Sequence, residues 1–296
     1  MAESLIPVDL YNPGQVLACL GLLEAADVLC GNAEGGFDLS NETSVRFRLN
    51  ATGNQKPLET VLKFLAGAEI MIVYPAGIEG PWPNSSELSE EFPASYTALK
   101  KSDGKALSAA SLPARLKCGS KSVQISHWLK GDERQTFKLF AGQQVGTQLL
   151  ANMLDGDRKK NVSKGFKEIF QRFDEADFDD PFSVVCAVGG RFGFDARGGW
   201  DALRIGTSLD KQGILVSAAP HVELLAAIGL ENTRPNFLST YEIQYAAWLE
   251  LLPLTLCRVA LFAPDTFLLR DQCRFFRAHL GNDKQYKECF FAELEE

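Results

Sequence analysis

The stretch from Asn12 to Gly31 reads NPGQVLACLGLLEAADVLCG and has the features of a buried helix. Asn12 can accept a hydrogen bond from a free backbone amide at the helix start, and Pro13 suits the first helical position. Gly31 can adopt the left-handed conformation that ends a helix. The apolar residues between these ends cover most of the helix circumference, which is typical of a helix inside a protein. We therefore predict a buried helix over residues 15–30.

The segments that follow predict a mixed α+β arrangement. Residues 37–49 alternate between apolar and polar side chains, which indicates a hairpin with one solvated face. Residues 57–65 start with proline and predict a second helix, and residues 69–74 predict a buried strand. Proline, glycine, serine and asparagine cluster in residues 75–105, so we expect a long loop there.

The middle of the chain predicts a strand over residues 120–128 and helices over residues 143–155 and 164–173. The second half reads as β-rich, with one helix over residues 221–228 and a final helical or mixed segment over residues 270–280. The strands that we expect in this half cover residues 182–188, 191–195, 214–218, 241–249 and 254–262.

The fold class that results is α+β. It has an N-terminal α/β region around the buried first helix, a helical basic middle region and a β-rich C-terminal half. An acidic segment over residues 174–180 precedes a proline and marks the best internal boundary. We therefore expect regions over residues 1–180 and 181–296, or one continuous domain.

Composition places the chain among ordinary globular proteins. Of its 296 residues, 46% are hydrophobic and 23% charged, which excludes a predominantly disordered chain. Charge-free stretches such as residues 10–23 fall short of the roughly 18–20 apolar residues that span a bilayer. The acidic start lacks the basic residues and the long apolar core of a secretory signal. We therefore expect no membrane association and a cytoplasmic location.

The net charge of −8 conceals a strong asymmetry along the chain. Residues 100–172 contain 15 Lys and Arg against six Asp and Glu, a balance of +9, whereas the rest of the chain carries −17. This asymmetry favours one basic face on an otherwise acidic body, and nucleic-acid phosphates bind such a face. The competing interpretation is an ordinary solvated surface.

The side-chain patterns of common catalytic and cofactor sites are missing from the sequence. His127, His221 and His279 stand far apart, and the seven cysteines include no Cys-x-x-Cys pair. The sequence also has no P-loop and no Gly-x-Ser-x-Gly elbow. We therefore expect no metal, no cofactor and no enzymatic activity.

One candidate nucleic-acid contact is the segment TFKLFAGQQ over residues 136–144. Lys138 stands between aromatic residues and can contact a phosphate, while Gln143 and Gln144 precede a helix and can hydrogen-bond a base edge. The alternative is that the apolar residues of this segment belong to the core and the two glutamines to a helix surface.

Two further segments supply candidate contacts. Residues 191–204 interleave Arg191 and Arg197 with aromatic residues and glycines, which suits a surface that binds a nucleic-acid backbone. The alternative for this segment is a tight turn in which Asp195 pairs with Arg197. The polar turn over residues 155–161 adds three candidate phosphate contacts, namely Arg158, Lys159 and Lys160.

The opening segment over residues 6–27 reads IPVDLYNPGQVLACLGLLEAAD. It resembles the N-terminus of a CRISPR-associated family of similar length, the large-subunit-like components of type I-G (formerly type I-U) interference complexes. Residues 136–144 and 191–200 also resemble that family. Together with the chain length, the resemblance extends over most of the sequence.

This resemblance implies a non-enzymatic subunit of Cascade, the RNA-guided DNA-surveillance complex of prokaryotic antiviral defence. In related complexes the large subunit lies near the guide RNA, reads the short motif beside the target (the PAM) and helps to recruit a helicase-nuclease. The implied partners are the guide RNA (crRNA), target double-stranded DNA, the other Cascade subunits and the helicase-nuclease effector. Base pairing would supply sequence specificity, so the protein itself needs a basic face and no active site.

Two alternatives stay open on the sequence alone. A metal-independent endoribonuclease that processes guide RNA would use His127 as its general acid or base, with Lys130 or Lys138 stabilising charge on the phosphate. An ordinary cytosolic scaffold would use the basic window to bind an acidic protein.

Overall fold

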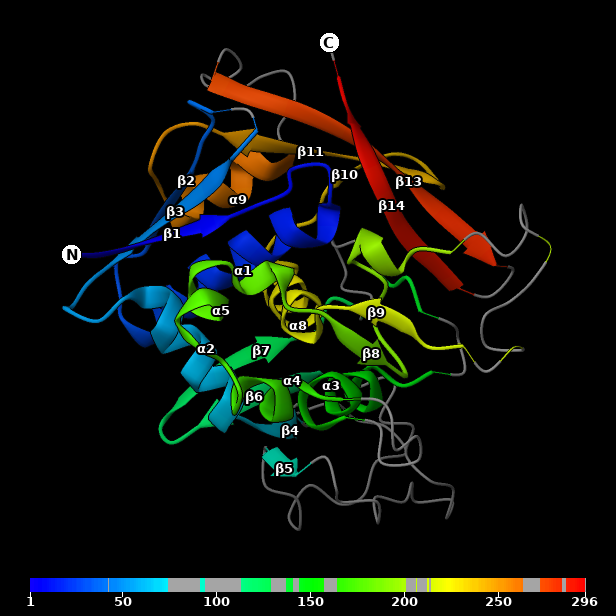
Figure 1. The fold of residues 1–296 in the computed structure, drawn as a ribbon, viewed down its shortest axis with the longest axis horizontal. Coiled ribbons are helices and arrows are strands. Elements are labelled where there is room, and N and C mark those ends of the chain that lie inside the picture. The colour runs from blue at the N-terminus through cyan, green and yellow to red at the C-terminus, as the bar shows by residue number, and fades with distance from the viewer. Residues whose placement is uncertain are drawn as a thin grey trace, which may run out of the picture.

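Helix α1 (Pro13–Leu29) runs through the middle of the computed structural model (Figure 1). Asn12 is its N-cap and accepts a hydrogen bond from the backbone N–H of Gly14 at 3.1 Å. After its end, Gly31 has a φ of +87°, in the left-handed region. Residues 13–26 are all buried. The prediction of a capped, buried first helix is therefore confirmed.

The described residues form a mixed α+β fold, as the sequence predicts. Side chains are described throughout these residues except at 91–93, 282, 283 and 286. The described ranges are 1–41, 43–73, 91–93, 113–128, 137–140, 144–156, 164–200, 206, 212, 214–262, 272–283 and 286–295.

Helix α8 (Pro220–Gly229) lies against α1 and is also buried along its whole length. The two backbones come close because both helices carry a glycine where they meet. A Cβ on Gly21 would overlap the carbonyl group of Leu225, and a Cβ on Gly229 would lie 2.8 Å from the backbone nitrogen of Gly21. This close pair forms the centre of the core, where burial of one large apolar side chain contributes about 1.5–3 kcal/mol.

The N-terminal residues form a sheet beside α1. Its central strand β3 (Arg46–Ala51) pairs antiparallel with both β1 (Ala2–Pro7) and β2 (Glu34–Asp38). A two-residue strand, β12 (Leu252–Pro253), continues the sheet next to β2. Helix α2 (Pro57–Gly67) contacts both this sheet and α1. The predicted hairpin and second helix are confirmed, whereas the sequence analysis did not find β1.

A second antiparallel sheet has the order β5-β4-β6-β7. Its strands are β4 (Glu69–Val73), β5 (Glu91–Pro93), β6 (Ala114–Cys118) and β7 (Lys121–Ile125). Apart from β5, the loop predicted over residues 75–105 lies outside the described residues.

Short helices continue the chain after this sheet. Helix α3 (Gly146–Asp155) contacts α8 and β4, and α4 (Phe166–Phe170) contacts α2 and α3. The acidic segment forms α5 (Glu175–Asp179), which is followed by the 3-10 turn η2 (Pro181–Ser183), and both lie against β1. The described parts of the two predicted middle helices are therefore helical, but shorter than expected.

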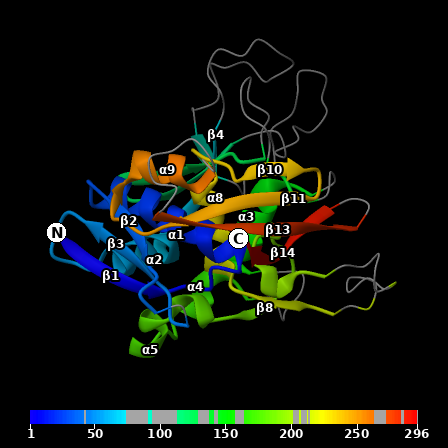
Figure 2. The ribbon, with the colours of Figure 1, turned by 90° about the horizontal axis from the view of Figure 1, so that it is seen from above.

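The third sheet has the order β10-β11-β13-β14, and all its pairs are antiparallel. It consists of β10 (Asn236–Ser239), β11 (Glu242–Trp248), β13 (Cys273–Asp283) and β14 (Tyr286–Leu294). Figure 1 shows it above α1, with the β4–β7 sheet below α1 and α8. Seen from above in Figure 2, β11 and β13 cross the middle of the molecule.

Three loops cover the outer edge of β14, where an edge strand would otherwise offer its backbone N–H groups to another chain. Each loop contributes one backbone carbonyl that accepts a hydrogen bond from the strand. The pairs are Lys287 with Leu139 at 2.6 Å, Cys289 with Gly193 at 2.8 Å, and Ala292 with Tyr11 at 2.7 Å.

Four predictions for the C-terminal half differ from the structure. The strand expected over residues 182–188 is present only as β8 (Cys186–Val188), because residues 181–183 form the 3-10 turn η2. Residues 254–262 form a helix, α9 (Leu254–Phe262), rather than a strand. Its buried residues recur at helical spacing after Pro253, whereas a short apolar run by itself fits either element. Residues 191–195 form an irregular loop instead of a strand, for a reason given below. The segment expected to be helical or mixed over residues 270–280 contributes instead to β13.

The remaining strands, β8 (Cys186–Val188) and β9 (Val216–Ala218), pair with each other in a two-stranded sheet. One buried apolar cluster takes residues from both halves of the sequence, from Ile6 to Ala292. The core therefore runs across the acidic segment at residues 174–180.

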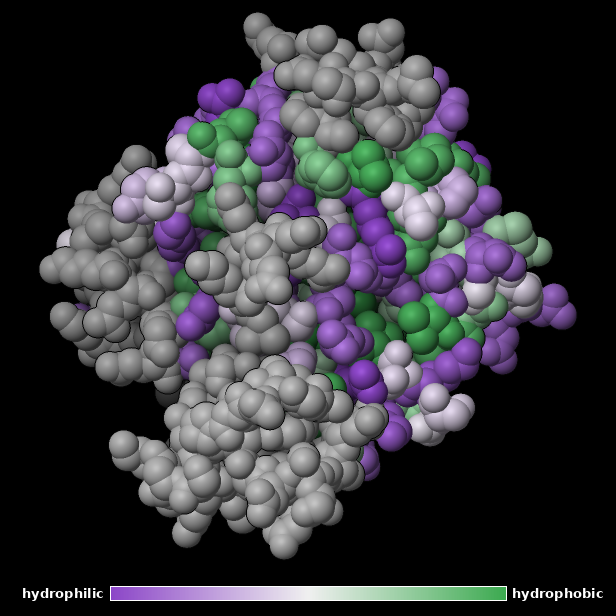
Figure 3. Space-filling view, turned by 180° about the vertical axis from the view of Figure 1, so that it is seen from behind, coloured by the Kyte–Doolittle hydropathy of each residue, from purple (hydrophilic) through white to green (hydrophobic). Residues whose placement is uncertain are grey.

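On the face seen in Figure 3, apolar residues lie in separate patches among hydrophilic ones. Scattered exposed apolar side chains are common on protein surfaces, so these patches do not indicate a site. None of the helices that the structure describes has the length and apolar character needed to cross a membrane.

Candidate nucleic-acid interface

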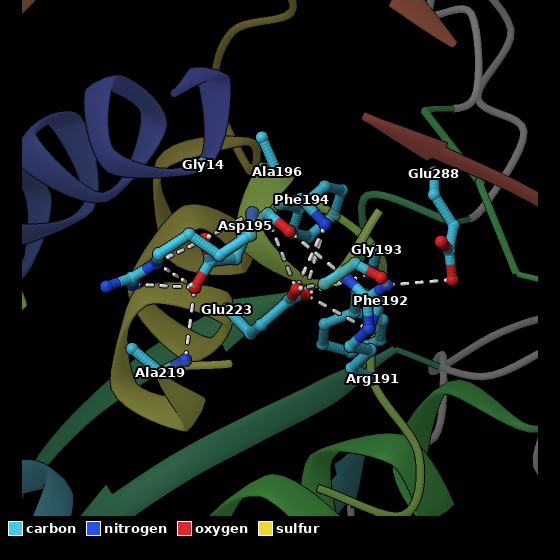
Figure 4. Close-up of polar contacts among 12 residues, drawn as sticks. Gly14, Arg191, Phe192, Gly193, Phe194, Asp195, Ala196, Ala219, Glu223 and Glu288 are labelled. Carbon is cyan, nitrogen blue, oxygen red and sulfur yellow. Dashed lines mark hydrogen bonds and ion pairs between the residues drawn. The ribbon is translucent and has the colours of Figure 1, made fainter. Parts of the chain in front are cut away.

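The carboxylate of Glu223, on α8, holds the loop of residues 191–198 by its backbone (Figure 4). It accepts hydrogen bonds from four consecutive backbone N–H groups, those of residues 192–195, at 3.0–3.2 Å. Burial raises the pKa of Glu223, although Arg191 and the backbone donors oppose this shift. Because the carboxylate occupies these amides, they cannot pair with a neighbouring strand. This is why the predicted strand does not form.

Asp195 joins the same loop to the start of α1. Its Oδ1 lies 2.8 Å from Nδ2 of Asn12, and its Oδ2 accepts a hydrogen bond from the backbone N–H of Ala219 at 3.0 Å. Asn12 Oδ1 in turn accepts from the backbone N–H of Ala196 at 3.1 Å. Burial works to raise the pKa of Asp195, but the hydrogen bonds it accepts, above all from Arg197, hold it below the ordinary value. Asp195 therefore acts as a fixed, ionised cross-link.

The side chain of Arg191 binds other groups of the protein itself. Its side chain is 6% exposed and forms ion pairs with Glu223 at 3.4 Å and with Glu288 of β14 at 2.8 Å. It also donates to the backbone carbonyls of Asp195, at 3.3 Å, and Gly198. Its guanidinium therefore has no face left for a nucleic acid, and we do not retain Arg191 as a contact.

Arg197 lies in the 3-10 turn η3 (Ala196–Gly198) and reaches the surface. Its Nε and Nη2 bind the carboxylate of Asp195 at 2.9 Å and 2.7 Å, and its Nη1 donates to the carbonyl of Phe182 at 2.6 Å. The side chain is 24% exposed. The pairing of Asp195 with Arg197 is thus the arrangement of the alternative interpretation, although the outer edge of Arg197 still faces a cavity.

That cavity has a volume of about 650 Å³, within the range of about 300–1,000 Å³ that is usual for small-molecule sites. Its wall combines the segment before α1, the β2–β3 connection, the turn after α5, η3 and the ends of β13 and β14. The lining residues are Pro7, Val8, Asp9, Leu10, Tyr11, Gln15, Leu39, Thr43, Ser44, Val45, Asp180, Phe182, Ser183, Arg197, Arg274, Phe276 and Leu294.

The cavity wall carries both cations and carboxylates. Arg274 is exposed, and its side chain forms no hydrogen bond or ion pair within the described part of the chain. Arg197 is already compensated by Asp195. Asp9 accepts the backbone N–H of Tyr11 at 2.9 Å through one of its two oxygens, and Asp180 lies between α5 and η2. The wall therefore offers donors to an anion and acceptors to hydroxyl or amino groups.

The backbone around Tyr11 is fixed on several sides. The carbonyl of Leu10 accepts a hydrogen bond from the hydroxyl of Tyr245 at 2.8 Å, and the carbonyl of Tyr11 accepts from Ala292 at 2.7 Å. The ring of Tyr11 meets that of Phe276 edge-on, with centroids 5.5 Å apart, and remains 48% exposed. Tyr11 is therefore an exposed aromatic ring on a rigid support.

Of the sequence-predicted contacts among the described residues, only Arg197 lines the cavity. Lys138 is half-buried, with its Nζ 4.7 Å from the ring centre of Phe140, and is not part of the cavity wall. Its apolar neighbours are buried, which agrees with the core interpretation of that segment. Gln144 is exposed ahead of α3. The remaining four candidates, Gln143, Arg158, Lys159 and Lys160, lie outside the described residues.

Three cations of the basic window pair with carboxylates nearby. Lys164 and Arg172 pair with Glu168 at 3.1 Å and 3.3 Å, and Lys167 pairs with Asp155 at 2.8 Å. Because Lys164 and Arg172 share Glu168, these three cations and two carboxylates keep a net charge of +1. Much of the window, including the turn with Arg158, is not among the described residues.

His127, the candidate catalytic residue of the ribonuclease alternative, is completely buried. Its ring packs against the rings of Trp128, Phe192 and Phe194, with centroids 5.0, 4.8 and 5.3 Å away. Burial lowers the pKa of His127 well below its ordinary value, and Arg234 adds to this effect. A histidine in this position cannot reach an RNA phosphate, so the geometry does not favour this alternative.

The other histidines have structural surroundings. His221 is buried, and its Nε2 lies 2.6 Å from the carbonyl oxygen of Pro181. Burial lowers the pKa of His221 to about 4. His279 is exposed on β13, 3.6 Å from Glu242. Over the described ranges, no three His, Cys, Asp or Glu side chains gather closely enough to hold a metal ion.

The sequence analysis did not identify Glu223, Tyr11 or Arg274. Glu223 left a signal, because a single carboxylate in the apolar segment PHVELLAAIG indicates a buried, hydrogen-bonded acid. The position of Arg274 depends on the course of β13, which the sequence analysis did not predict.

In comparisons with known proteins, no family model, no curated protein and no solved structure matches this chain.

Proposed function

We propose that the protein is a cytoplasmic, non-catalytic subunit of an RNA-guided DNA-surveillance complex of the Cascade type, and that it acts in antiviral defence. Its partners would be guide RNA, target double-stranded DNA, the other Cascade subunits and the helicase-nuclease effector. Its tasks would be to contact these nucleic acids, to read the PAM and to help recruit that effector.

The joining of two distant segments is the observation that carries this proposal. Residues 6–27 and 191–200 both resemble the type I-G large-subunit-like family. Asn12 in the first segment binds Asp195 in the second, and both segments contribute to the wall of one cavity. The two segments that resemble the family thus contact each other in the fold, and this contact is what we take as support for the proposal.

The surroundings of the two buried histidines argue against a catalytic role for them. A general acid or base must lie within hydrogen-bond reach of its substrate. His127 and His221 are enclosed in the core, and neither belongs to the described cavity wall. The two arginines of that wall offer planar guanidinium N–H donors, which suits them to bind phosphate.

Purification with the proteins encoded by neighbouring genes tests the proposal. An affinity tag on this chain should recover a complex that contains a uniform short RNA. That complex should then retard a DNA duplex carrying the complementary target and the correct PAM more strongly than one with a scrambled PAM. Recovery of the protein alone, free of RNA, would contradict the proposal.

A cleavage assay separates the proposal from the ribonuclease alternative. Labelled repeat RNA incubated with the purified chain in EDTA should stay intact. A His127→Phe variant serves as the matched control, because phenylalanine fits an aromatic environment and removes the candidate acid–base group. If the original chain cleaves the RNA and the His127→Phe variant does not, the result would support the ribonuclease alternative instead.

A further inference from the structure

The cavity beside the joined segments combines three features that suit a nucleotide. It contains an arginine with no partner among the described residues, an exposed aromatic ring on a fixed backbone, and two carboxylates. The arginine comes from the start of β13, and the aromatic ring comes from the residues before α1. One carboxylate comes from those same residues and the other from the turn after α5.

Arg274 supplies the anchor for an anion. A guanidinium offers several N–H donors in one plane and binds phosphate oxygens in pairs. Arg197 faces the same space, and the hydrogen bonds to Asp195 and Phe182 fix its orientation. Arg274 would therefore contribute most of the electrostatic attraction for the phosphate, and Arg197 would help to orient it.

Tyr11 supplies a stacking surface. Any nucleobase can stack on an aromatic ring, because every base has a flat π-face. The gain in binding free energy is largest when the ring is already fixed in place. Hydrogen bonds from Tyr245 and Ala292 hold the backbone at positions 10 and 11, and Phe276 supports the ring edge-on. Tyr11 is 48% exposed as a residue, so a ligand can approach it.

Asp9 and Asp180 determine which kind of nucleic acid fits. Ionised carboxylates only accept hydrogen bonds and would repel a second phosphate. They therefore favour hydroxyl and amino groups, and the ribose 2′-hydroxyl, present in RNA and absent from DNA, is such a donor. A closed duplex also cannot place a single base against Tyr11, because its bases are stacked and paired.

We propose that this cavity binds one nucleotide of single-stranded RNA. The phosphate lies at Arg274 and Arg197, the base stacks on Tyr11, and the ribose faces the carboxylates of Asp9 and Asp180. This assignment rests on the proposed function for its biological setting, since a surveillance complex contains a guide RNA. The site itself belongs to the isolated chain and can be tested there.

Fluorescence anisotropy with a labelled five-nucleotide RNA tests the site on the full chain at low salt. Tyr11→Ala should weaken binding about 5- to 150-fold, the range that base–aromatic stacking supplies, while Tyr11→Phe should keep most of the affinity. Arg274→Met should also weaken binding and reduce the salt dependence by about one phosphate contact. A DNA strand of the same sequence should bind more weakly than the RNA.

Arg277→Met provides the matched control. Arg277 lies on the same strand as Arg274, but it is exposed, pairs with Glu295 at 2.8 Å and is not part of the cavity wall. Its replacement should leave RNA binding unchanged. Unchanged melting temperatures of the Arg274→Met and Tyr11→Phe variants would show that the fold is retained.

The outcomes separate this site from the wider proposal. If the Arg274→Met and Arg277→Met variants bind RNA equally well, or if RNA and DNA bind alike, the cavity assignment is wrong. In that case a purified complex that still holds guide RNA leaves the proposed function standing. If the chain purifies alone and without RNA yet shows the expected differences among its variants, the proposed function fails while the site remains.

Discussion

The side-chain nitrogen of Asn12 lies 2.8 Å from a carboxylate oxygen of Asp195, although 183 positions separate the two residues in the sequence. Asn12 also caps α1 and accepts the backbone N–H of Ala196. One asparagine thus connects the central helix to the loop that borders the cavity. Both residues are completely buried, so if one side chain is removed, water cannot take its place as a hydrogen-bond partner of the other.

Asn12→Ala should therefore lower the free energy of unfolding by about 2–4 kcal/mol, since it removes a helix cap and leaves Asp195 without one of its donors. Urea unfolding followed by circular dichroism measures this loss. The control is Asn41→Ala, because Asn41 is exposed and bonds only within its own turn, and its replacement should cost less than about 0.5 kcal/mol. Equal losses for the two variants would show that the buried contact contributes nothing beyond an ordinary turn.

Glu223→Gln should be more damaging, although the two side chains have nearly the same shape. The new amide group would point N–H donors at backbone N–H donors, and Arg191 would lose the buried one of its two carboxylate partners. Removal of one partner from a buried ion pair costs about 3–5 kcal/mol. The measurement is again the urea unfolding midpoint, compared with Glu175→Gln on the exposed first turn of α5. A loss no larger than that of the control would contradict the role assigned to Glu223.

Gly21→Ala should disrupt the packing of α1 on α8. The added methyl group would overlap the carbonyl of Leu225, a backbone group that cannot rotate away. Overpacking of this kind costs about 1–3 kcal/mol or more, seen as a lower melting temperature. Gly67→Ala is the matched helical control, because its Cβ would meet only the side-chain sulfur of Cys118, at 3.0 Å. This control should be close to neutral, and a similar drop in both variants would argue against the close helix contact.

Stability should fall in mild acid because two histidines are buried in their neutral form. Burial lowers the pKa of His127 well below its usual value and that of His221 to about 4. The unfolded chain binds these protons near pH 6.5, so the stabilisation is complete above that pH. It is lost as the pH falls from about 6.5 towards 4, by at most about 1.4 kcal/mol per pH unit for each group.

The variants His127→Phe and His279→Phe separate this effect from general acid unfolding. The first should flatten the decline of the urea midpoint between pH 7 and pH 5, because it removes one buried proton acceptor. The second removes an exposed histidine on β13 and controls for the loss of an imidazole as such. Identical slopes for both variants would mean that other groups control the acid sensitivity.

Local patterns predict the first helix well because its signals lie within the helix itself. Asn12, Pro13 and Gly31 define its ends, and apolar residues on all sides indicate that it is buried. The same reasoning fails for α9 and for residues 191–195. In both places a short apolar or alternating run fits a strand, and contacts with distant elements determine the actual conformation.

The candidate site is less predictable than the fold. Arg191 and Arg197 look alike in sequence, since both stand among aromatic residues and glycines. One is enclosed by Glu223 and Glu288, and the other reaches a cavity. Which of them faces solvent depends on residues between 32 and 97 positions away from Arg191 in the sequence, and a local pattern cannot contain that information.

The carbonyl of Tyr11 accepts the N–H of Ala292 on β14, so the ring of Tyr11 depends for its support on a residue that lies 281 positions later in the sequence. During synthesis, the segment around Tyr11 therefore has no such support until β14 has left the ribosome. A nascent or truncated chain that lacks β14 could therefore pair α1 with α8 and still have no rigid wall at the cavity. Binding competence would then depend on the synthesis of β14, and contacts of such long sequence separation also predict slow folding.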